Sequence, residues 1–327
     1  MAAWVVRSVL LPLALLLPSI PYSLAATVTY DFDIGWVNAN PDGQRDRPVI
    51  GINGKWPIPR IEANVGDRII VNAVNSLGNQ STSLHFHGLF MKNATHMDGP
   101  VQVSQCPIPP GSHFTYNFTV SIVMDPFCAE FSCELTPEQI DQPGTYWYHS
   151  HNKGQYPDGL RGPLIIHDPE SPFKDDYDEE LILTVTDWYH DEMPGLIDFF
   201  MSKANPSGAE PVPKAALFND TTDLEIHFQP GKTYLIRMIN IGAFAGQYVW
   251  FEGHNISIVE VDGVYTEPAE AEMIYLAASQ RCSFLIAAKN ETGANFPFVA
   301  SMDTVSCPHR VYTRGFFWSF NTNILES

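Results

Sequence analysis

Two short runs of alternating histidines are the residues of this chain best suited to chemistry. The first reads LHFHG and contains His85 and His87; the second reads WYHSH and contains His149 and His151. On an extended strand, residues i and i+2 point to the same face, so each run can direct both imidazoles toward one ion or toward adjacent ions. A single run of this kind also occurs as ordinary surface or core sequence. Two runs flanked by aromatic residues favour a metal site, and copper(II) heads the affinity order of divalent ions for imidazole, with zinc and iron as alternatives.

Length and composition place these runs in a folded, acidic protein. The chain has 327 residues, enough for about two domains. Its 45% apolar content supports packed cores, and 17% charged residues are too few for a disordered chain. The net charge of −19 argues against nucleic acid or anionic lipid as a partner, because either requires a basic surface. A cation as substrate or cofactor suits this charge.

The beginning of the chain predicts passage through the secretory route. Residues 1–25 form a predicted signal peptide, with an arginine near the start, an apolar stretch and a small-residue cleavage site. A retained membrane anchor is the alternative, although Pro12 and Pro18 interrupt the apolar stretch. Several N-glycosylation sequons agree with secretion. They are at Asn79, Asn93, Asn117, Asn219, Asn255 and Asn290.

The five cysteines leave one unpaired in an oxidising compartment, and their spacing matches no zinc finger. One compatible pairing joins Cys106 to Cys282 and thereby the two halves of the chain, but the sequence does not fix the pairing. The others are Cys128, Cys133 and Cys307.

Short β-branched and aromatic runs separated by Gly, Pro and Asn must position the histidines. They form two series, and each series predicts one antiparallel β-sandwich. The first domain is expected at residues 26–168 and the second at 175–303, joined by an acidic, solvated linker. A helix is expected at 195–203. The predicted strands are 27–32, 68–74, 83–90, 113–120, 145–149 and 164–167, then 181–187, 224–228, 233–240, 256–261, 273–277 and 283–287.

Four motifs in fixed order identify a family. They read SLHFHG, MDG, QCPI and GTYWYHSH, and with them the chain resembles the multicopper oxidases. The stretches PVIGING, FMS, NPSGAEP and VEVDG make it most similar to the fungal iron-uptake ferroxidases. The resemblance covers about residues 27–303. It implies an all-β protein of cupredoxin-like Greek-key sandwiches, of which this chain represents the first two and lacks the third.

The resemblance also implies a role for each histidine. His85 would bind the type 2 copper, whereas His87, His149 and His151 would bind the type 3 copper pair of a trinuclear cluster. Reducing dioxygen to water requires several one-electron metals held close together, and imidazoles on strands can fix their spacing. Gly88 either admits a copper-bound oxygen species or another backbone, or forms a strand bulge.

An acidic residue at the start of the second domain contributes to Fe(II) binding and electron transfer in the ferroxidases. The matching residue is Asp187, in the run TDWYH. A carboxylate is a hard oxygen ligand that favours the ferric product. The alternative is an aspartate at a strand end that makes a turn contact.

The chain departs from the family pattern in two places. It contains no His-Cys-His run, so it offers no type 1 copper site and only half of the trinuclear ligands; the only late cysteine near a histidine is Cys307, close to His309. About twenty extra residues, 121–140, precede the second histidine run, where so long a loop is unusual in a hairpin. The resemblance is lost at Val120-Ser121, where this insert begins, and at Val305-Ser306, in the non-family tail 304–327. Because Val-Ser can be encoded by GTN-AGN, the start of a fungal intron, we interpret both segments as translated introns.

These observations predict a multicopper oxidase of ferroxidase type, which oxidises Fe(II) to Fe(III) and reduces dioxygen to water by four electrons. The chain alone is expected to be inactive. The predicted location is extracellular or on the outer face of the plasma membrane, with an iron permease as a membrane partner. The alternatives are a laccase-like phenol oxidase and a non-catalytic copper-binding or mis-spliced fragment.

Overall fold

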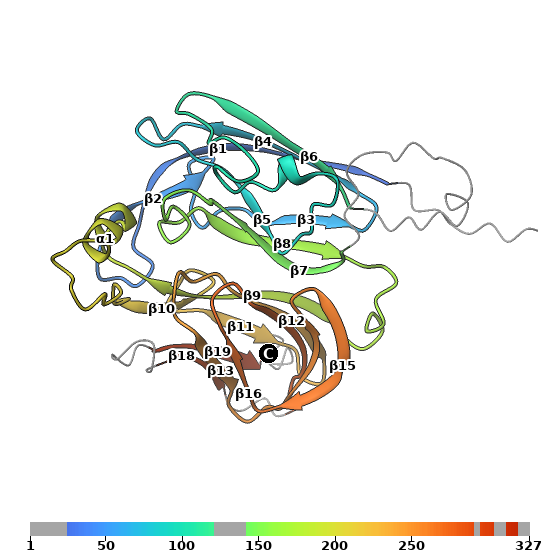
Figure 1. Ribbon diagram of the computed structural model, residues 1–327. Helices are drawn as coiled ribbons and strands as arrows, with labels where there is room; N and C mark the ends of the chain where they lie inside the picture. The colour runs from blue at the N-terminus through green and yellow to red at the C-terminus, as the bar shows by residue number, and fades with distance from the viewer. Residues whose placement is uncertain (1–24, 121–141, 291–294, 304–311, 320–327) are drawn as a thin grey trace, which may run out of the picture.

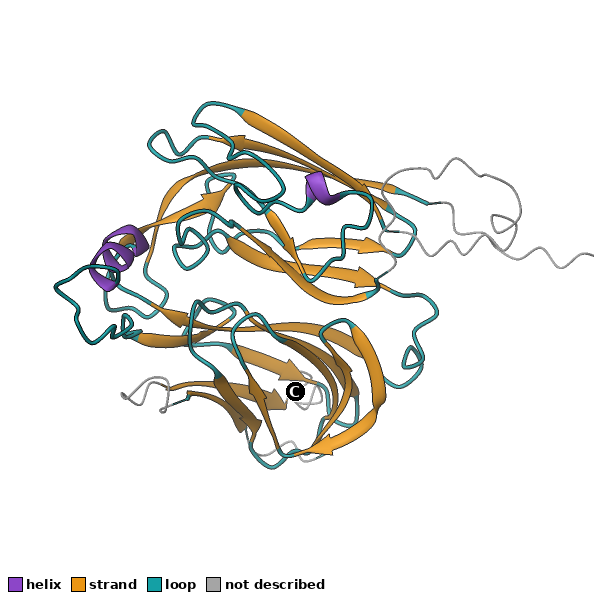
Figure 2. Ribbon diagram, viewed as in Figure 1, coloured by secondary structure: helices purple, strands orange, loops and turns teal. Residues whose placement is uncertain are grey.

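The computed structural model describes residues 25–120, 142–290, 295–303 and the backbone of strand 312–319. These residues form two β-sandwiches that lie one above the other, joined by a single linker (Figure 1). Strands dominate these ranges, and the helices described within them are two short segments, α1 (Met193–Phe200) and the 3-10 turn η1 (Thr95–Met97) (Figure 2). No helix within these ranges has the length and apolar character needed to cross a bilayer. The predicted all-β, cupredoxin-like fold is confirmed.

The first sandwich packs two four-stranded sheets around one core. In β4 the buried residues alternate with more exposed ones, as expected for a strand with one face on a core. Phe86, Tyr116 and Tyr148 are among the buried residues between the sheets. One sheet has the order β2 (Arg47–Ile52), β1 (Thr27–Ala39), β4 (Arg68–Asn75), β6 (His113–Thr119), and the other β3 (Ile61–Asn64), β8 (Arg161–His167), β7 (Gly144–His149), β5 (His85–His87).

The second sandwich packs a six-stranded sheet on a five-stranded sheet. Its core includes Leu183, Met238 and Phe284. The six-stranded sheet has the order β10 (Ala215–Phe218), β9 (Glu179–Trp188), β12 (Thr233–Asn240), β17 (Arg281–Ala287), β14 (Ile256–Val261), β15 (Val264–Ala271). The other has the order β11 (Glu225–Phe228), β19 (Tyr312–Ser319), β18 (Phe296–Met302), β13 (Gln247–Phe251), β16 (Met273–Leu276).

The strands agree with the predicted runs, and several were not predicted. β12 and β14 have the predicted bounds, whereas β2, β3, β10, β13, β15, β18 and β19 were missed because they are short or contain Pro, Gly or Glu. Helix α1 begins two residues earlier than predicted, with Pro194 in its first turn. β19 lies beyond residue 303, where the second domain was predicted to end, and it pairs with β18 and β11. The signal peptide, residues 121–140, Cys307 and His309 lie outside the described residues.

The two sandwiches contact each other through apolar and polar side chains. Trp147 of β7 packs with Ile239 and Ile241 of the second sandwich. On the other side of the interface, Val49 of β2 packs with Trp188 of β9. Because the strand that carries His149 also forms this interface, the second sandwich can influence the geometry of the histidines.

The predicted link between Cys106 and Cys282 is wrong. Both are free thiols: Cys106 is exposed on a loop of the first sandwich, and Cys282 is buried in the core of the second. A disulfide requires Cα atoms within about 7 Å, and a residue inside one sandwich core does not meet that condition with an exposed loop of the other.

This arrangement predicts very different thiol reactivity. Burial, followed by the charges of Glu260 and Asp262, raises the pKa of the Cys282 thiol to about 12. The thiolate is the reactive form, so at pH 8 we expect Cys282 to react at least about a thousandfold more slowly than Cys106. Alkylation of the native chain followed by peptide mass mapping measures both rates. Equal rates in the folded chain would contradict the burial of Cys282.

Candidate metal centre

The two histidine runs lie on neighbouring strands. β5 and β7 pair antiparallel, with His85 opposite His149 and His87 opposite Trp147. One ligand atom each from His85, His87 and His149 lies within 4.8 Å of the other two. The period of two along each strand therefore brings the predicted imidazoles into one space.

His151 follows β7 and adds a fourth ring. Its ring centroid lies 5.6 Å from that of His85 and 5.9 Å from that of His149. His151 is exposed, whereas His149 is 4% exposed. Because the neighbouring Phe86 and Tyr148 point into the core, the cluster lies on the opposite face of the sheet and extends from the buried His149 to the exposed His151.

Backbone carbonyls fix the orientation of two rings. The Nδ1 of His85 lies 2.7 Å from the Asp98 carbonyl oxygen, and the Nδ1 of His149 lies 2.9 Å from that of Ser150. A carbonyl oxygen only accepts, so each Nδ1 carries the proton and each Nε2 keeps its lone pair for a metal. The Nδ1 of His87 lies 3.3 Å from the Nε2 of His149, so both atoms face the shared space.

Two imidazoles of the cluster, those of His87 and His149, have lowered pKa values. Burial, and then the charge of His85, lowers the pKa of His87 to about 3. Burial also holds the pKa of His149 well below its usual value. Neutral imidazole is the form that binds a metal ion, so protons compete weakly for these nitrogens at neutral pH.

The MDG motif positions His85. Gly99 has a φ of +100°, and a Cβ there would overlap the carbonyl of Leu84. Only glycine lets the backbone at residue 99 lie so close to Leu84. Asp98 is thereby placed beside His85, with its carbonyl oxygen and its carboxylate both near His85 Nδ1, the carboxylate at 3.1 Å. Sequence reasoning used the motif only as a mark of the family and missed Asp98. The sequence feature that could have pointed to Asp98 was the neighbouring glycine, Gly99.

A cavity of about 320 Å³ opens beside the cluster. His87, His149 and His151 form one side of it, and Trp147 and Tyr156 line it with aromatic rings. Ser279 of the second sandwich also lines it. A molecule as small as dioxygen or water can therefore reach the histidines from the junction of the sandwiches.

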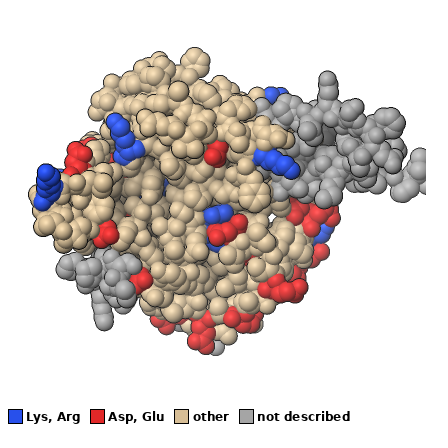
Figure 3. Space-filling model, in the orientation of Figure 1, with Lys and Arg blue, Asp and Glu red and all other residues tan. Residues whose placement is uncertain are grey.

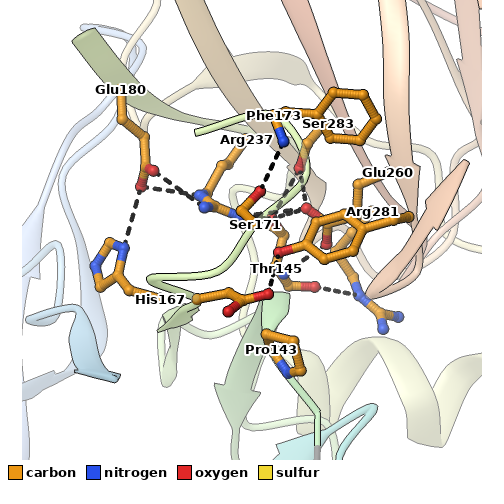
Figure 4. A network of polar contacts seen from close by, with 12 residues as sticks. Pro143, Thr145, His167, Ser171, Phe173, Glu180, Arg237, Glu260, Arg281 and Ser283 are labelled. Atoms are coloured by element: carbon orange, nitrogen blue, oxygen red, sulfur yellow. Dashed lines mark hydrogen bonds and ion pairs between the residues drawn. The ribbon is translucent and has the colours of Figure 1, made fainter. Parts of the chain in front are cut away.

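The second sandwich holds β7 through a buried polar network (Figure 4). One carboxylate oxygen of Glu260 accepts from the backbone N–H of Thr145 at 2.7 Å, and the other accepts from the Ser283 hydroxyl at 2.7 Å. Arg237 donates to Glu260 at 3.2 Å and forms an ion pair with Glu180 at 2.8 Å. Sequence reasoning missed these residues because the partners are distant along the chain.

Asp187 is buried at the end of β9. It is 2% exposed, and its carboxylate accepts hydrogen bonds from the backbone N–H groups of residues 243–245 at 2.7–3.0 Å and from the Tyr189 hydroxyl at 3.2 Å. These hydrogen bonds match the alternative role given above for Asp187, a strand-end aspartate that makes a turn contact. Its predicted part in Fe(II) oxidation stays a prediction.

Two family models cover most of the chain. A multicopper oxidase model matches residues 33–124 and 129–171, and a second multicopper oxidase model matches residues 179–318. The chain belongs to the multicopper oxidase family. Copper is the cofactor of that family, and the converging imidazole nitrogens of the cluster suit it.

Curated multicopper oxidases from fungi are similar to most of this chain. The iron transport multicopper oxidase fetC of Epichloe festucae is 63% identical over 290 residues, which are 89% of this chain and 43% of that protein. The iron transport multicopper oxidase FET3 of Gibberella zeae is 64% identical over 280 residues, which are 86% of this chain and 42% of that protein. The chain thus spans less than half the length of these relatives.

Solved multicopper oxidases share the fold. Fet3p, described as a multicopper oxidase that functions in iron import, aligns with a TM-score of 0.82 at 40% identity, over 92% of this chain and 54% of that chain. A laccase from Botrytis aclada aligns with a TM-score of 0.75 at 27% identity, over 93% of this chain and 55% of that chain.

The predicted glycosylation residues differ in accessibility. Asn79, Asn93, Asn255 and Asn290 are exposed. Asn117 is half-buried, and its side-chain oxygen accepts from Arg68 at 2.7 Å. Asn219 is half-buried as well, and its side-chain amide donates to the Ile182 carbonyl at 3.1 Å. A glycan on Asn219 would be attached to this same nitrogen, which would keep one N–H.

Proposed function

We propose that this chain forms the first half of an iron-oxidising multicopper oxidase, in which His85 binds the type 2 copper and His87, His149 and His151 bind the type 3 pair. The convergence of His85, His87 and His149 within 4.8 Å carries the proposal. Identities of 63% and 64% to iron transport multicopper oxidases support the choice of iron as substrate.

The described residues prepare a site for the metal. Copper, when bound, supplies the one-electron steps that join Fe(II) oxidation to the four-electron reduction of dioxygen to water. The carbonyls of Asp98 and Ser150 orient two of the imidazoles. Trp147 stacks on His149 with ring centroids 4.0 Å apart and limits the rotation of that ring.

The acidic surface is consistent with a cationic substrate. On the face in Figure 3, acidic side chains gather over the second sandwich and exceed the basic ones there. A negative field raises the local concentration of cations such as Fe(II). We further propose a secreted, glycosylated protein at the outer face of the plasma membrane, with an iron permease as the partner that takes up Fe(III).

Copper loading and iron oxidation of the purified chain test this proposal. We expect Cu(II) to bind, but no blue colour and no Fe(II) oxidation above background, because the chain contains no His-Cys-His run to form a type 1 site. A full-length fungal relative, assayed in parallel, serves as the positive control. A blue chain that oxidises Fe(II) unaided would contradict the proposal, as would a chain that binds no copper.

A laccase-like phenol oxidase is the second candidate, because a laccase shares the fold with a TM-score of 0.75 and the Asp187 carboxylate is occupied by N–H donors. A substitution at the residue that matches Asp187 in a full-length relative distinguishes the ferroxidase from the phenol oxidase. For a ferroxidase, replacing it with Ala should lower kcat/KM for Fe(II) about tenfold more than for a phenol, a difference of about 1.4 kcal/mol. Equal losses would favour the phenol oxidase. The amide variant, which keeps an acceptor for the turn, is the control for loss of the turn contact.

A non-catalytic or mis-spliced fragment is the third candidate. The two segments that we interpret as translated introns, 121–140 and the tail from residue 304, lie largely outside the described residues. Their origin stays a prediction.

A further inference from the structure

We propose that Arg281, contributed by the second sandwich, is a positioning residue for the histidine cluster of the first. The two sandwiches then build the metal centre together. The inference rests on the proposed metal site and adds to it a residue that touches neither metal nor substrate.

Arg281 is held rigidly at the domain interface. It begins β17 and is 5% exposed. Its Nε donates to the Thr145 carbonyl at 3.0 Å (Figure 4). Its Nη1 donates to the Ser279 carbonyl and pairs with Asp262, both at 3.1 Å. A guanidinium in this geometry links β7 of the first sandwich to the second, and its planar fork fixes the direction of each bond.

The remaining nitrogen faces the end of β5. A Cβ built on Gly88 would lie 2.5 Å from Arg281 Nη2 and 2.9 Å from a ring carbon of Tyr146. Gly88 directly follows His87 and has a φ of +93°. The space left by the missing side chain is therefore occupied by Arg281. This explains the glycine better than the predicted roles, which were a bulge and the close approach of an oxygen species or of another backbone.

Strand β5, which ends one residue before Gly88, has few interactions of its own. β5 has three residues and lies at the edge of its described sheet, paired with β7 alone. Its Gly88 end is also held by Gln142, whose side-chain amide donates to the Gly88 carbonyl at 3.1 Å. So short an edge strand depends on side-chain packing to keep His85 opposite His149. Arg281 donates to Thr145 of β7 and lies beside Gly88, the residue that follows β5, so it can set the separation of the imidazoles on the two strands.

The guanidinium also lies over the Tyr146 ring of β7, 5.4 Å from its centroid. A cation over an aromatic face is attracted to it, so this contact adds to the hold of Arg281 on β7.

Titration of the full chain with Cu(II) tests the proposal in two variants and one control. Arg281→Gln removes the charge and the fork, whereas Gly88→Ala keeps Arg281 but fills the space it occupies. Arg45→Gln is the control, because Arg45 forms an exposed ion pair with Asp191 across the sandwiches at 2.9 Å and contacts neither β5 nor β7. The readouts are the dissociation constant for Cu(II), the electron paramagnetic resonance spectrum of bound Cu(II), and thermal unfolding.

We expect both variants to bind Cu(II) about 10- to 100-fold more weakly, with a changed spectrum, and to keep a cooperative unfolding transition. The control should match the wild type. Folded variants with wild-type affinity and spectrum would overturn the proposal. Loss of the unfolding transition in both variants would also overturn it, because Arg281 would then serve folding in general. If the wild-type chain binds no Cu(II), the proposed metal site itself fails.

Discussion

Glu260→Ala is expected to lower the free energy of unfolding by about 3–5 kcal/mol, the range found when one partner of a buried ionic network is removed. Glu260 is 2% exposed and serves both sandwiches at once. Its loss leaves the Thr145 N–H and the Ser283 hydroxyl without their acceptor and removes one of the two carboxylates around Arg237. Each buried donor left unsatisfied costs about 1–3 kcal/mol.

Urea denaturation of the purified chain measures this effect. Glu260→Gln keeps an acceptor oxygen at the same place and should therefore cost less than Glu260→Ala. Glu270→Ala, an exposed substitution on β15, is the matched control and should change stability by less than about 0.5 kcal/mol. A loss below about 1 kcal/mol for Glu260→Ala would show that the interface does not depend on this network.

His149→Ala should weaken Cu(II) binding by more than about 100-fold, beyond the 10- to 100-fold range typical of residues that only orient a ligand. His149 lies opposite His85, and its Nε2 lies 3.3 Å from the Nδ1 of His87. Removing it takes away a ring that faces both residues of the other run. The remaining imidazoles no longer form the compact group of three.

Copper per chain after gel filtration, together with a competition titration, checks this result. His113→Ala is the control, because His113 is exposed on β6 of the same sandwich and lies outside the cluster. An unchanged stoichiometry and affinity in a folded His149→Ala chain would place the copper elsewhere. Because bound metal stabilises the folded state, added Cu(II) should also raise the unfolding temperature of the wild type more than that of the variant.

The histidine cluster could be predicted because its signal is local. Side chains two residues apart on a strand share a face, so each of the two aromatic-flanked runs places its imidazoles on one side. The pairing of His85 with His149 follows once the two strands are neighbours. The two-sandwich fold was predictable for the same reason, from short alternating runs between turn residues. The missed strands, such as β15 with its glutamates and proline, lack that alternation.

The residues that support the cluster could not be predicted, because their partners are far apart in sequence. Glu260 meets Thr145 across 115 residues, and no local pattern marks such a pair. Gly88 could be singled out, but the side chain that needs its space belongs to the second sandwich. The predicted cysteine pairing was wrong for a similar reason, because the spacing of cysteines in the sequence does not show which thiol is buried and which is exposed.

The burial of Glu260, Arg237 and Trp147 between the sandwiches limits how the cluster can be transplanted. A first sandwich cut away at the linker would expose Trp147 to water and leave the Thr145 N–H without its carboxylate acceptor. A miniature copper protein built from β5 and β7 would therefore need a designed apolar cap that also supplies an anion for Thr145 and a cation for the Gly88 edge.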